Sequence, residues 1–300
     1  MSDVFRHRLA LATCAAFPRL TNDDAPLLAA LPPLGIHPEP CIWNDPAVDW
    51  AGYDAVLVRS TWDYFEHHDA FLAWLDRLDA LGVPMLNDSR LLRWNSDKRY
   101  LGELATHGVA TIPTRYALPG TLRDTLRTFH GEDVVVKPSV SGGAWRTARG
   151  RVGAAGFEQA VAQLPDTSAY LVQPFVPQVA DEGEWSLLYF DGAYSHAVLK
   201  RPAAGDYRVQ HEHGGSAVAA EPDAIARAAA ERALAGVAAL GHAGTAYARV
   251  DGVRVGDRFL LMELELIEPA LHLASHPGAA ARFARQLAER LPALARAGTR

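Results

Sequence analysis

The chain has 300 residues, of which 49% are hydrophobic and 21% are charged, and its formal net charge at pH 7 is −6. This composition supports a sizeable buried core, as expected of a soluble protein with one large domain or two to three smaller ones. Acidic and basic residues are interspersed, and no basic run is interleaved with aromatic residues, so we expect no nucleic-acid partner.

The first residues, Met1 to Arg8, lack the apolar core of a signal peptide. No run approaches the ~20 apolar residues that a membrane-spanning helix needs. Cys14 and Cys41 are the only cysteines, too few for a disulfide framework. We therefore expect a cytoplasmic protein with reduced thiols and no membrane partner.

Strand and helix patterns alternate in the first third of the chain. Apolar runs at 8–14, 53–58 and 83–86 predict strands, and the patterns at 21–31 and 69–81 predict helices. This alternation predicts a parallel sheet with crossover helices.

The segment after the second strand, Arg59 to Tyr64, is expected at the carboxyl edge of that sheet, where ligands of parallel sheets bind. Arg59 can hold a substrate carboxylate. Ser60, Thr61 and Asp63 add polar groups beside it. A capped turn before the next helix explains the same residues, and the sequence leaves both interpretations open.

The stretch 134–145 places one lysine at the end of a valine run and small residues directly after it. Valines favour a buried strand, and an ammonium that emerges there, that of Lys137, needs an anion. Small residues let backbone N–H groups approach the same anion; they are Ser139, Ser141, Gly142 and Gly143. The pattern predicts a nucleotide-phosphate clamp, with an ordinary hairpin turn and a solvent-reaching lysine as the alternative.

Further elements follow from turn signals and apolar spacing. They are a helix at 96–107, a rigid crossing at Gln173–Pro177, a hairpin turn at Asp191–Gly192, a helix at 224–240 with an apolar stripe that includes Ile225, and a last helix at 279–297.

Two carboxylates, Glu263 and Glu265, alternate along an apolar run and so project from one face of a strand. Asp251 lies on the preceding strand of a predicted hairpin and can complete an oxygen cluster. Such hard ligands suit Mg²⁺ or Mn²⁺, which bridge to substrate phosphates. A solvent-facing acidic strand edge is the alternative.

The order of these motifs, with the lysine and small-residue loop first and the paired acids last, resembles the ATP-grasp superfamily of ligases from about Asn87 to Pro269. Within it, the chain is most similar to the bacterial group that includes the O-ureido-serine cyclo-ligase of cycloserine biosynthesis. That likeness lies in 60–64, 94–98 and 263–269. The superfamily most often has asparagine where this chain has Glu265, which adds a negative charge at the metal site.

The resemblance implies an α/β chain with α+β elements in the ATP-grasp fold: an N-terminal parallel α/β domain at 1–88 and two α+β subdomains, 89–175 and 176–300, that clamp ATP. The implied cofactors are ATP and Mg²⁺ (or Mn²⁺). The implied ATP-binding residues are Lys98, Lys137, Ser141, Gly142, Gly143, Gln173, Pro174, Phe175, Val176 and Glu184. The implied metal ligands are Asp251, Glu263 and Glu265, and the implied catalytic residues are Lys200, Arg208 and Arg249.

The implied reaction activates a small-molecule carboxylate as an acyl phosphate, which an amine then attacks. If the likeness to the cyclo-ligase is close, both groups belong to one O-ureido-serine-like amino acid and the attack closes a ring; otherwise two separate substrates are joined. An ATP-grasp kinase for a small molecule and a non-catalytic ATP-binding sensor are the alternatives. The implied partner is a small carboxylate or amine substrate, and the sequence leaves open whether the chain forms a homodimer.

Overall fold

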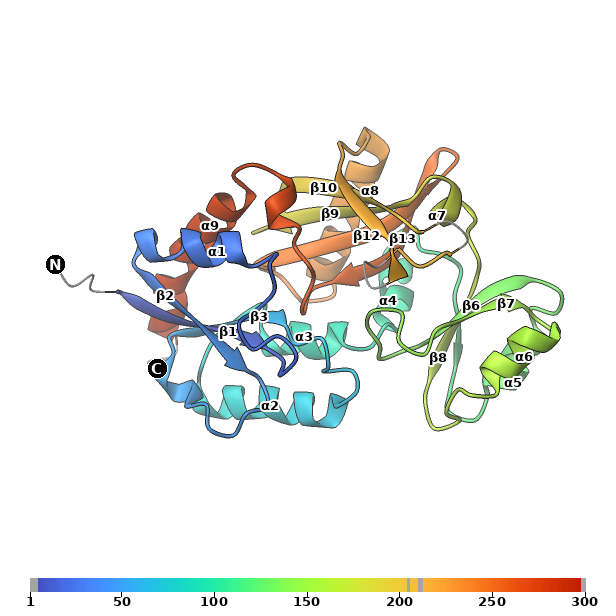
Figure 1. Ribbon diagram of the computed structural model, residues 1–300, viewed down its shortest axis with the longest axis horizontal. Helices are drawn as coiled ribbons and strands as arrows, with labels where there is room; N and C mark the ends of the chain where they lie inside the picture. Colours follow the sequence, from blue (N-terminus) through green and yellow to red (C-terminus); the bar gives the residue numbers. More distant parts are fainter. Residues whose placement is uncertain (1–4, 204–205, 210–212, 298–300) are drawn as a thin grey trace.

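The computed structural model describes residues 5–203, 206–209 and 213–297. Within these ranges the strands form three sheets that follow one another along the chain (Figure 1). The first sheet is parallel and the other two are antiparallel. The predicted α/β chain with α+β elements is therefore confirmed. No helix in the described ranges is both long and apolar enough to cross a membrane.

The parallel sheet has the strand order β2-β1-β3-β4. Helices α1 and α9 pack on one face, and α2 packs on the other. β2 carries no strand signal in the sequence because Pro38 and Pro40 interrupt it, and an edge position tolerates prolines. The elements are β1 (His7–Thr13), α1 (Ala25–Ala30), a 3₁₀ turn (Pro32–Leu34), β2 (Ile36–Ile42), a 3₁₀ turn (Trp50–Gly52), β3 (Ala55–Ser60), α2 (His68–Leu81), β4 (Met85–Leu86) and α9 (Ala279–Ala297).

The second sheet, in the order β5-β8-β6-β7, forms a lobe with α5 and α6 at one end of the molecule (Figure 1). Val134 and Val136 are fully buried against these helices, so the predicted buried strand is confirmed. Because side chains alternate along a strand, Lys137 points to the opposite face. The elements are α3 (Ser89–Asn95), α4 (Tyr100–Thr106), β5 (Arg115–Ala117), α5 (Leu122–Arg127), β6 (Asp133–Pro138), β7 (Ala148–Arg151), α6 (Ala155–Val161) and β8 (Tyr170–Pro174).

The third sheet has the order β11-β10-β9-β12-β13. Both predicted hairpins are present, and Asp191 and Gly192 adopt the positive φ angles that a tight hairpin turn needs. The elements are α7 (Gln178–Asp181), β9 (Glu184–Phe190), β10 (Ala193–Arg201), β11 (Ser216–Ala219), α8 (Ala224–Ala239), β12 (Tyr247–Val255), β13 (Arg258–Glu265) and a 3₁₀ turn (Leu273–Ser275).

The predicted apolar stripe of α8 is confirmed at Val237, which is 1% exposed, and is wrong at Ile225. Ile225 is 42% exposed, whereas Ala226, Ala230 and Ala233 are buried. These alanines belong to the core between α8 and the third sheet, where their small size allows close packing. The buried stripe therefore combines these alanines with Val237, and Ile225 lies outside it.

Two asparagine side chains, one directly after β4 and one at the end of α3, bind the third sheet and the segment after it. The Asn87 amide donates to the carbonyls of Tyr247 and Leu266 at 2.9 and 2.8 Å, and its oxygen accepts from the Ala246 N–H. The Asn95 amide bonds to β13 on both sides of Glu265, because it donates to the Leu264 carbonyl and accepts from the Leu266 N–H, at 2.8 and 2.9 Å. The end of β13 is thus held in a fixed place.

Candidate active site

Charged side chains from four segments of the chain meet at the third sheet. The register places Asp251 opposite Glu263 and Arg249 opposite Glu265, so the two strands β12 and β13 present these groups side by side. We call the whole group the charged cluster; its members are Lys98, Lys137, Glu184, Lys200, Arg249, Asp251, Glu263 and Glu265. The structure therefore brings together predicted residues that lie up to 167 positions apart, from Lys98 to Glu265.

The β12 part of the cluster is held by several short contacts. Asp251 bonds to Arg249 at 2.9 Å, to Lys200 at 3.3 Å and to the Ser186 hydroxyl at 2.6 Å. Lys200 also pairs with Glu184 at 2.5 Å. All of these side chains are at least 90% buried, so their charges are compensated by one another and little by water.

The β13 part uses the remaining cations. Lys98 Nζ lies 2.9 Å from Glu263, and Arg249 Nη2 contacts Glu265. Each of the three predicted metal ligands therefore has a cationic partner in the protein.

Burial and neighbouring charges shift the pKa values of these carboxyl groups in opposite directions. Burial opposes ionisation of Asp251, but Arg249 and Lys200 outweigh it and hold the pKa of Asp251 below its usual range. Lys98 and Lys137 likewise outweigh burial and lower the pKa of Glu263. At Glu265, burial prevails over Arg249 and, with the charges of Asp251 and Glu263, raises the pKa to about 7.

The donor set fits a hard divalent cation in chemistry. Carboxylate oxygens of Asp251 and Glu263 lie on neighbouring strands, and Glu265 lies on the same face. Within the described ranges, no three His, Cys, Asp or Glu side chains are already grouped as metal ligands, because each carboxylate is turned toward a lysine or an arginine. A metal would thus have to replace these cationic partners.

The two lysines predicted to bind phosphates differ in their surroundings. Lys98 donates to the Ser141 carbonyl and pairs with Glu263. Lys137 has neither an ion pair nor a hydrogen bond in the described part of the chain. Burial lowers the pKa of Lys137, against the opposing charge of Glu263. Its ammonium is thus the group of the cluster that most needs an anion.

The small-residue loop after β6 lies against the loop after β3. A Cβ atom on Gly142 would come within 2.8 Å of the Phe65 ring, so glycine is required for this approach. Gly143 has a φ of +55°, which glycine adopts without strain. Ser141 is buried, and its hydroxyl donates to the Pro138 carbonyl at 3.0 Å.

The predicted adenine hinge directly follows β8. The Gln173 side chain donates to the Thr114 hydroxyl at 2.8 Å, and Pro174 is the last residue of the strand. The Phe175 N–H donates to the Asp133 carbonyl at 2.8 Å, and the Val176 carbonyl accepts from Val179. In the described ranges, no hydrogen bond involves the Phe175 carbonyl or the Val176 N–H. An acceptor and a donor on successive residues match the edge of a purine ring.

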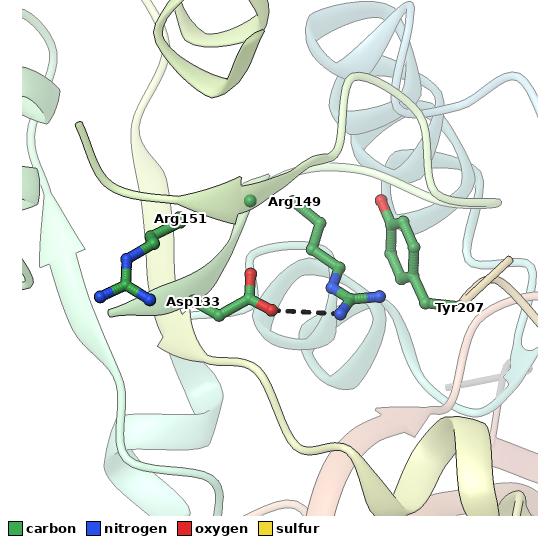
Figure 2. A pocket seen from close by; sticks show the side chains of 5 residues that line it. Asp133, Arg149, Arg151 and Tyr207 are labelled. Atoms are coloured by element: carbon green, nitrogen blue, oxygen red, sulfur yellow. Dashed lines mark hydrogen bonds and ion pairs between the residues drawn. The ribbon is translucent and has the colours of Figure 1, made fainter. Parts of the chain in front are cut away.

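A cavity of about 470 Å³ lies beside this hinge, away from the charged cluster. Figure 2 shows its lining, in which Arg149 pairs with Asp133 and lies beside Tyr207. The Arg149 guanidinium also stacks on the Phe175 ring, 3.4 Å from its centroid. Arg149 therefore connects the lining of the cavity to Phe175 of the hinge.

The residues predicted to bind substrate are packed into the structure. Arg59 is 1% exposed, donates to Asp24 at 2.7 Å and to the Pro269 carbonyl at 3.0 Å, and so ties distant segments together. Ser60 bonds to Thr13, and Asp63 accepts from the Trp43 indole. Two buried atoms of these residues, the Thr61 hydroxyl and Arg59 Nη1, have no hydrogen-bond partner in the described ranges.

Arg208, predicted as a catalytic group, is not part of the charged cluster. Its guanidinium pairs with Asp206 at 2.8 Å on the segment between β10 and β11. Asp206 and Arg208 are two positions apart in the sequence, so their side chains can pair locally.

Two residues that position β13 are not predicted from the sequence. Asn95 and the Tyr100 hydroxyl, which accepts from the Leu264 N–H at 2.9 Å, hold the strand that carries Glu263 and Glu265. Asn95 lies three residues before Lys98 in the same predicted ATP-binding motif. The motif does not predict the role of the Asn95 amide, because that role depends on contacts with the distant strand β13.

Residues 9–87 match the family described as the N-terminal domain of the D-cycloserine synthetase DcsG. The cycloserine biosynthesis protein DcsG of Streptomyces lavendulae is 37% identical over 298 residues, which cover 94% of this chain and 98% of that protein. The crystal structure of D-cycloserine synthetase DcsG matches with a TM-score of 0.85 at 37% identity, over 95% of this chain and 99% of that one. A D-alanine–D-alanine ligase from Bacillus anthracis, complexed with ATP, matches with a TM-score of 0.68 at 17% identity, over 97% of this chain and 99% of that one.

The fold is that of the ATP-grasp ligases. The identity of 37% with a synthetase of this fold, over 94% of the chain, makes the chain an ATP-dependent ligase. More narrowly, it belongs to the family of the cycloserine synthetase DcsG. The predicted superfamily, enzyme class and use of ATP are thereby confirmed.

Proposed function

We propose that this ligase uses ATP to activate the carboxylate of an O-ureido-serine-like amino acid and then closes a ring onto a nitrogen of the same molecule. The identity of 37% with DcsG, over 94% of the chain, supports this substrate class. The observation that carries the chemistry is the charged cluster, in which lysines and an arginine meet three carboxylates on β12 and β13.

In this proposal Asp251, Glu263 and Glu265 would hold Mg²⁺ or Mn²⁺, whose charge neutralises phosphate oxygens. Lys98 would exchange Glu263 for a phosphate oxygen. Lys137, which has no partner of its own in the described ranges, would gain one.

The nucleotide would extend from the hinge to these lysines. The Phe175 carbonyl and the Val176 N–H would bind adenine, with Gln173 and Pro174 fixing the strand end before them. Glu184 lies on β9 beside Lys200. The backbone at Ser141, Gly142 and Gly143 would cover the phosphates.

The first step transfers the γ-phosphoryl group. A carboxylate oxygen of the substrate attacks the γ-phosphorus, the bond to the β,γ-bridging oxygen breaks, and ADP leaves with that oxygen. Phosphoryl transfer depends chiefly on alignment and charge neutralisation, which the lysines supply.

The second step forms the new C–N bond. The substrate nitrogen attacks the acyl carbon and loses a proton, and phosphate leaves with the electron pair of the C–O bond. Arg249 and Lys200 would stabilise the oxyanion that forms between these events. By atom balance, an O-ureido-serine that becomes cycloserine also loses its carbamoyl group to hydrolysis, as carbon dioxide and ammonia.

The proposal is tested by incubating the protein with ATP, Mg²⁺ and O-ureido-serine, and by measuring ADP and the cyclic product by mass spectrometry. Hydroxylamine added to the reaction should trap the acyl phosphate as a hydroxamate. ATP-dependent formation of a stable phosphorylated substrate would instead indicate a kinase. ATP binding without turnover, across a panel of amino-acid carboxylates, would indicate a sensor.

A further inference from the structure

The segment Glu268–Leu273, directly after β13, has its carbonyl groups bound by side chains from four parts of the fold. Those of Glu268 and Pro269 accept from Trp62 at 2.9 Å and from Arg59 at 3.0 Å. Those of Ala270 and Leu271 are bound by two further side chains; these are Arg249 at 3.1 Å and His196 at 2.9 Å. Each carbonyl is thereby fixed individually, outside any helix or sheet.

The N–H groups of the same segment converge on one carboxylate. Asp23 accepts from the backbone of Leu271, His272 and Leu273 at 2.8, 2.9 and 2.8 Å. His272 also has a φ of +48°, which side chains other than glycine rarely adopt. The backbone of the segment is therefore held in one conformation by contacts from outside it.

Two polar side chains of this fixed segment, Glu268 and His272, have no partner on another residue in the described ranges. The Glu268 carboxyl group bonds only to its own backbone N–H, and His272 Nε2 is buried without a hydrogen bond. A buried polar atom left unpaired, such as His272 Nε2, costs about 1–3 kcal/mol and therefore requires an explanation. The Glu268 side chain is partly buried.

Both side chains border the charged cluster, at different points. Glu268 interacts electrostatically with Glu265, Lys98 and Glu263. His272 interacts with Arg249, Lys200 and Asp251, and burial together with these two cations lowers the pKa of His272 to about 3. The imidazole is thus neutral and retains one acceptor nitrogen, and the carboxyl group faces like charges that a cation would relieve.

A ligand that satisfies both groups must offer N–H donors, one of them cationic, next to a carboxylate that Arg249 can hold. We propose that Glu268 and His272 form an amine-recognition subsite, in which Glu268 binds the α-ammonium of an amino-acid substrate and His272 accepts a hydrogen bond from its second nitrogen. This inference rests on the proposed ligase function, and it defines the substrate class as small α-amino acids with a second nitrogen in the side chain.

The test compares O-ureido-serine with the analogue that lacks the α-amine, 3-(ureidooxy)propanoate. In the wild-type protein the analogue should bind at least about 10-fold more weakly, the value of a charge-assisted hydrogen bond. Glu268→Gln should bind the two compounds equally, with the KM for ATP changed less than about twofold. Glu268→Asp should recover part of the preference, and His272→Asn should raise the KM for O-ureido-serine with both compounds still distinguished.

Matched controls are Glu231→Gln, at an exposed position of α8, and His107→Asn, at the exposed position directly after α4. They should leave the preference for the α-amine unchanged. Binding is measured by calorimetry, so that it can be read without turnover. A wild-type protein that binds both compounds equally, or a Glu268→Gln variant that keeps the full preference, overturns the subsite. A protein that prefers the α-amine but forms neither ADP nor hydroxamate retains the subsite and overturns the proposed function.

Discussion

The two sides of the charged cluster differ in how their charges are compensated. On the β12–β13 side, each of the carboxylates Asp251, Glu263 and Glu265 has a lysine or arginine partner. On the β6 side, Lys137 has no partner in the described part of the chain. The Phe175 carbonyl and the Val176 N–H of the hinge also have no hydrogen bond within these residues. The first side thus contributes to the folded structure as well as to ligand binding, whereas the second side is available for ligand binding alone.

This contrast separates stability from activity. Removal of one partner from a buried ion pair costs about 3–5 kcal/mol, because the other charge is left unpaired. Removal of an unpartnered buried charge instead relieves a desolvation cost. Substitutions on the β12–β13 side should therefore impair folding and turnover, and substitutions on the β6 side should impair turnover only.

The largest effect is expected for Arg249→Met, since Asp251 and Glu265 then both lose an arginine. The free energy of unfolding should fall by about 3–5 kcal/mol, measured by urea denaturation, and turnover should be lost. Arg123→Met, which removes a surface pair of 3.9 Å, is the control and should cost less than about 1 kcal/mol. Equal costs for the two variants would contradict the contrast, and Arg249→Lys, which keeps a charge, covers the case that Arg249→Met does not fold.

Glu263→Gln should lower kcat at least about 100-fold while only weakening ATP binding, because a neutral amide is a poor ligand for a divalent cation. The amide can still accept a hydrogen bond from Lys98, so the loss of stability should be smaller than for Arg249→Met. Turnover is measured over a Mg²⁺ titration. Full activity in this variant would remove Glu263 from the proposed metal site.

Lys137→Met should raise the KM for ATP by roughly 10-fold or more, the value of a charge-assisted hydrogen bond to phosphate. The free energy of unfolding should stay the same or rise, since no partner in the described ranges is left unpaired. Lys98→Met is the matched variant and should lower stability, because Glu263 loses its ion pair. If Lys137→Met proves the less stable of the two, the two sides do not differ as described.

The smallest effect is a pH dependence of stability from Glu265. Its pKa of about 7 in the folded protein is raised from 4.5, so between these values the folded state binds more protons than the unfolded state. The contribution of Glu265 to stability is then present at low pH and is lost as pH rises from about 4.5 to about 7. Denaturation midpoints of the wild type and Glu265→Gln, measured over this range, should converge toward the acid end. Parallel curves would show that Glu265 does not titrate there.

Much of the fold and part of the candidate site were predictable from the sequence. Periodicity and turn residues were enough for β6, for the β12–β13 hairpin and for the face shared by Glu263 and Glu265, because these depend on local chemistry. β2 was not found, since its strand character comes from pairing with β1 and not from its own proline-containing sequence.

Side-chain partners were harder to predict, because they depend on where remote segments meet. Arg59 lies at the end of a parallel strand, as a carboxylate-binding arginine would, but Asp24 and the Pro269 carbonyl already bind Nε and Nη2 of its guanidinium. The pairing of the metal-site acids with Lys98 and Arg249 has the same cause. No pattern in the sequence near these residues predicts such contacts.

The anchoring of the segment Glu268–Leu273 has a consequence for the way this family can diverge. Three of its anchors, Asp23, Arg59 and Trp62, belong to the first sheet and its loops, whereas the segment itself belongs to the last third of the chain. A chimaera that takes its first 87 residues from a relative with different anchors should therefore lose substrate selectivity even with every charged group of the third sheet intact. Evolution of a new substrate selectivity would require paired changes in the first third and in the last third of the chain.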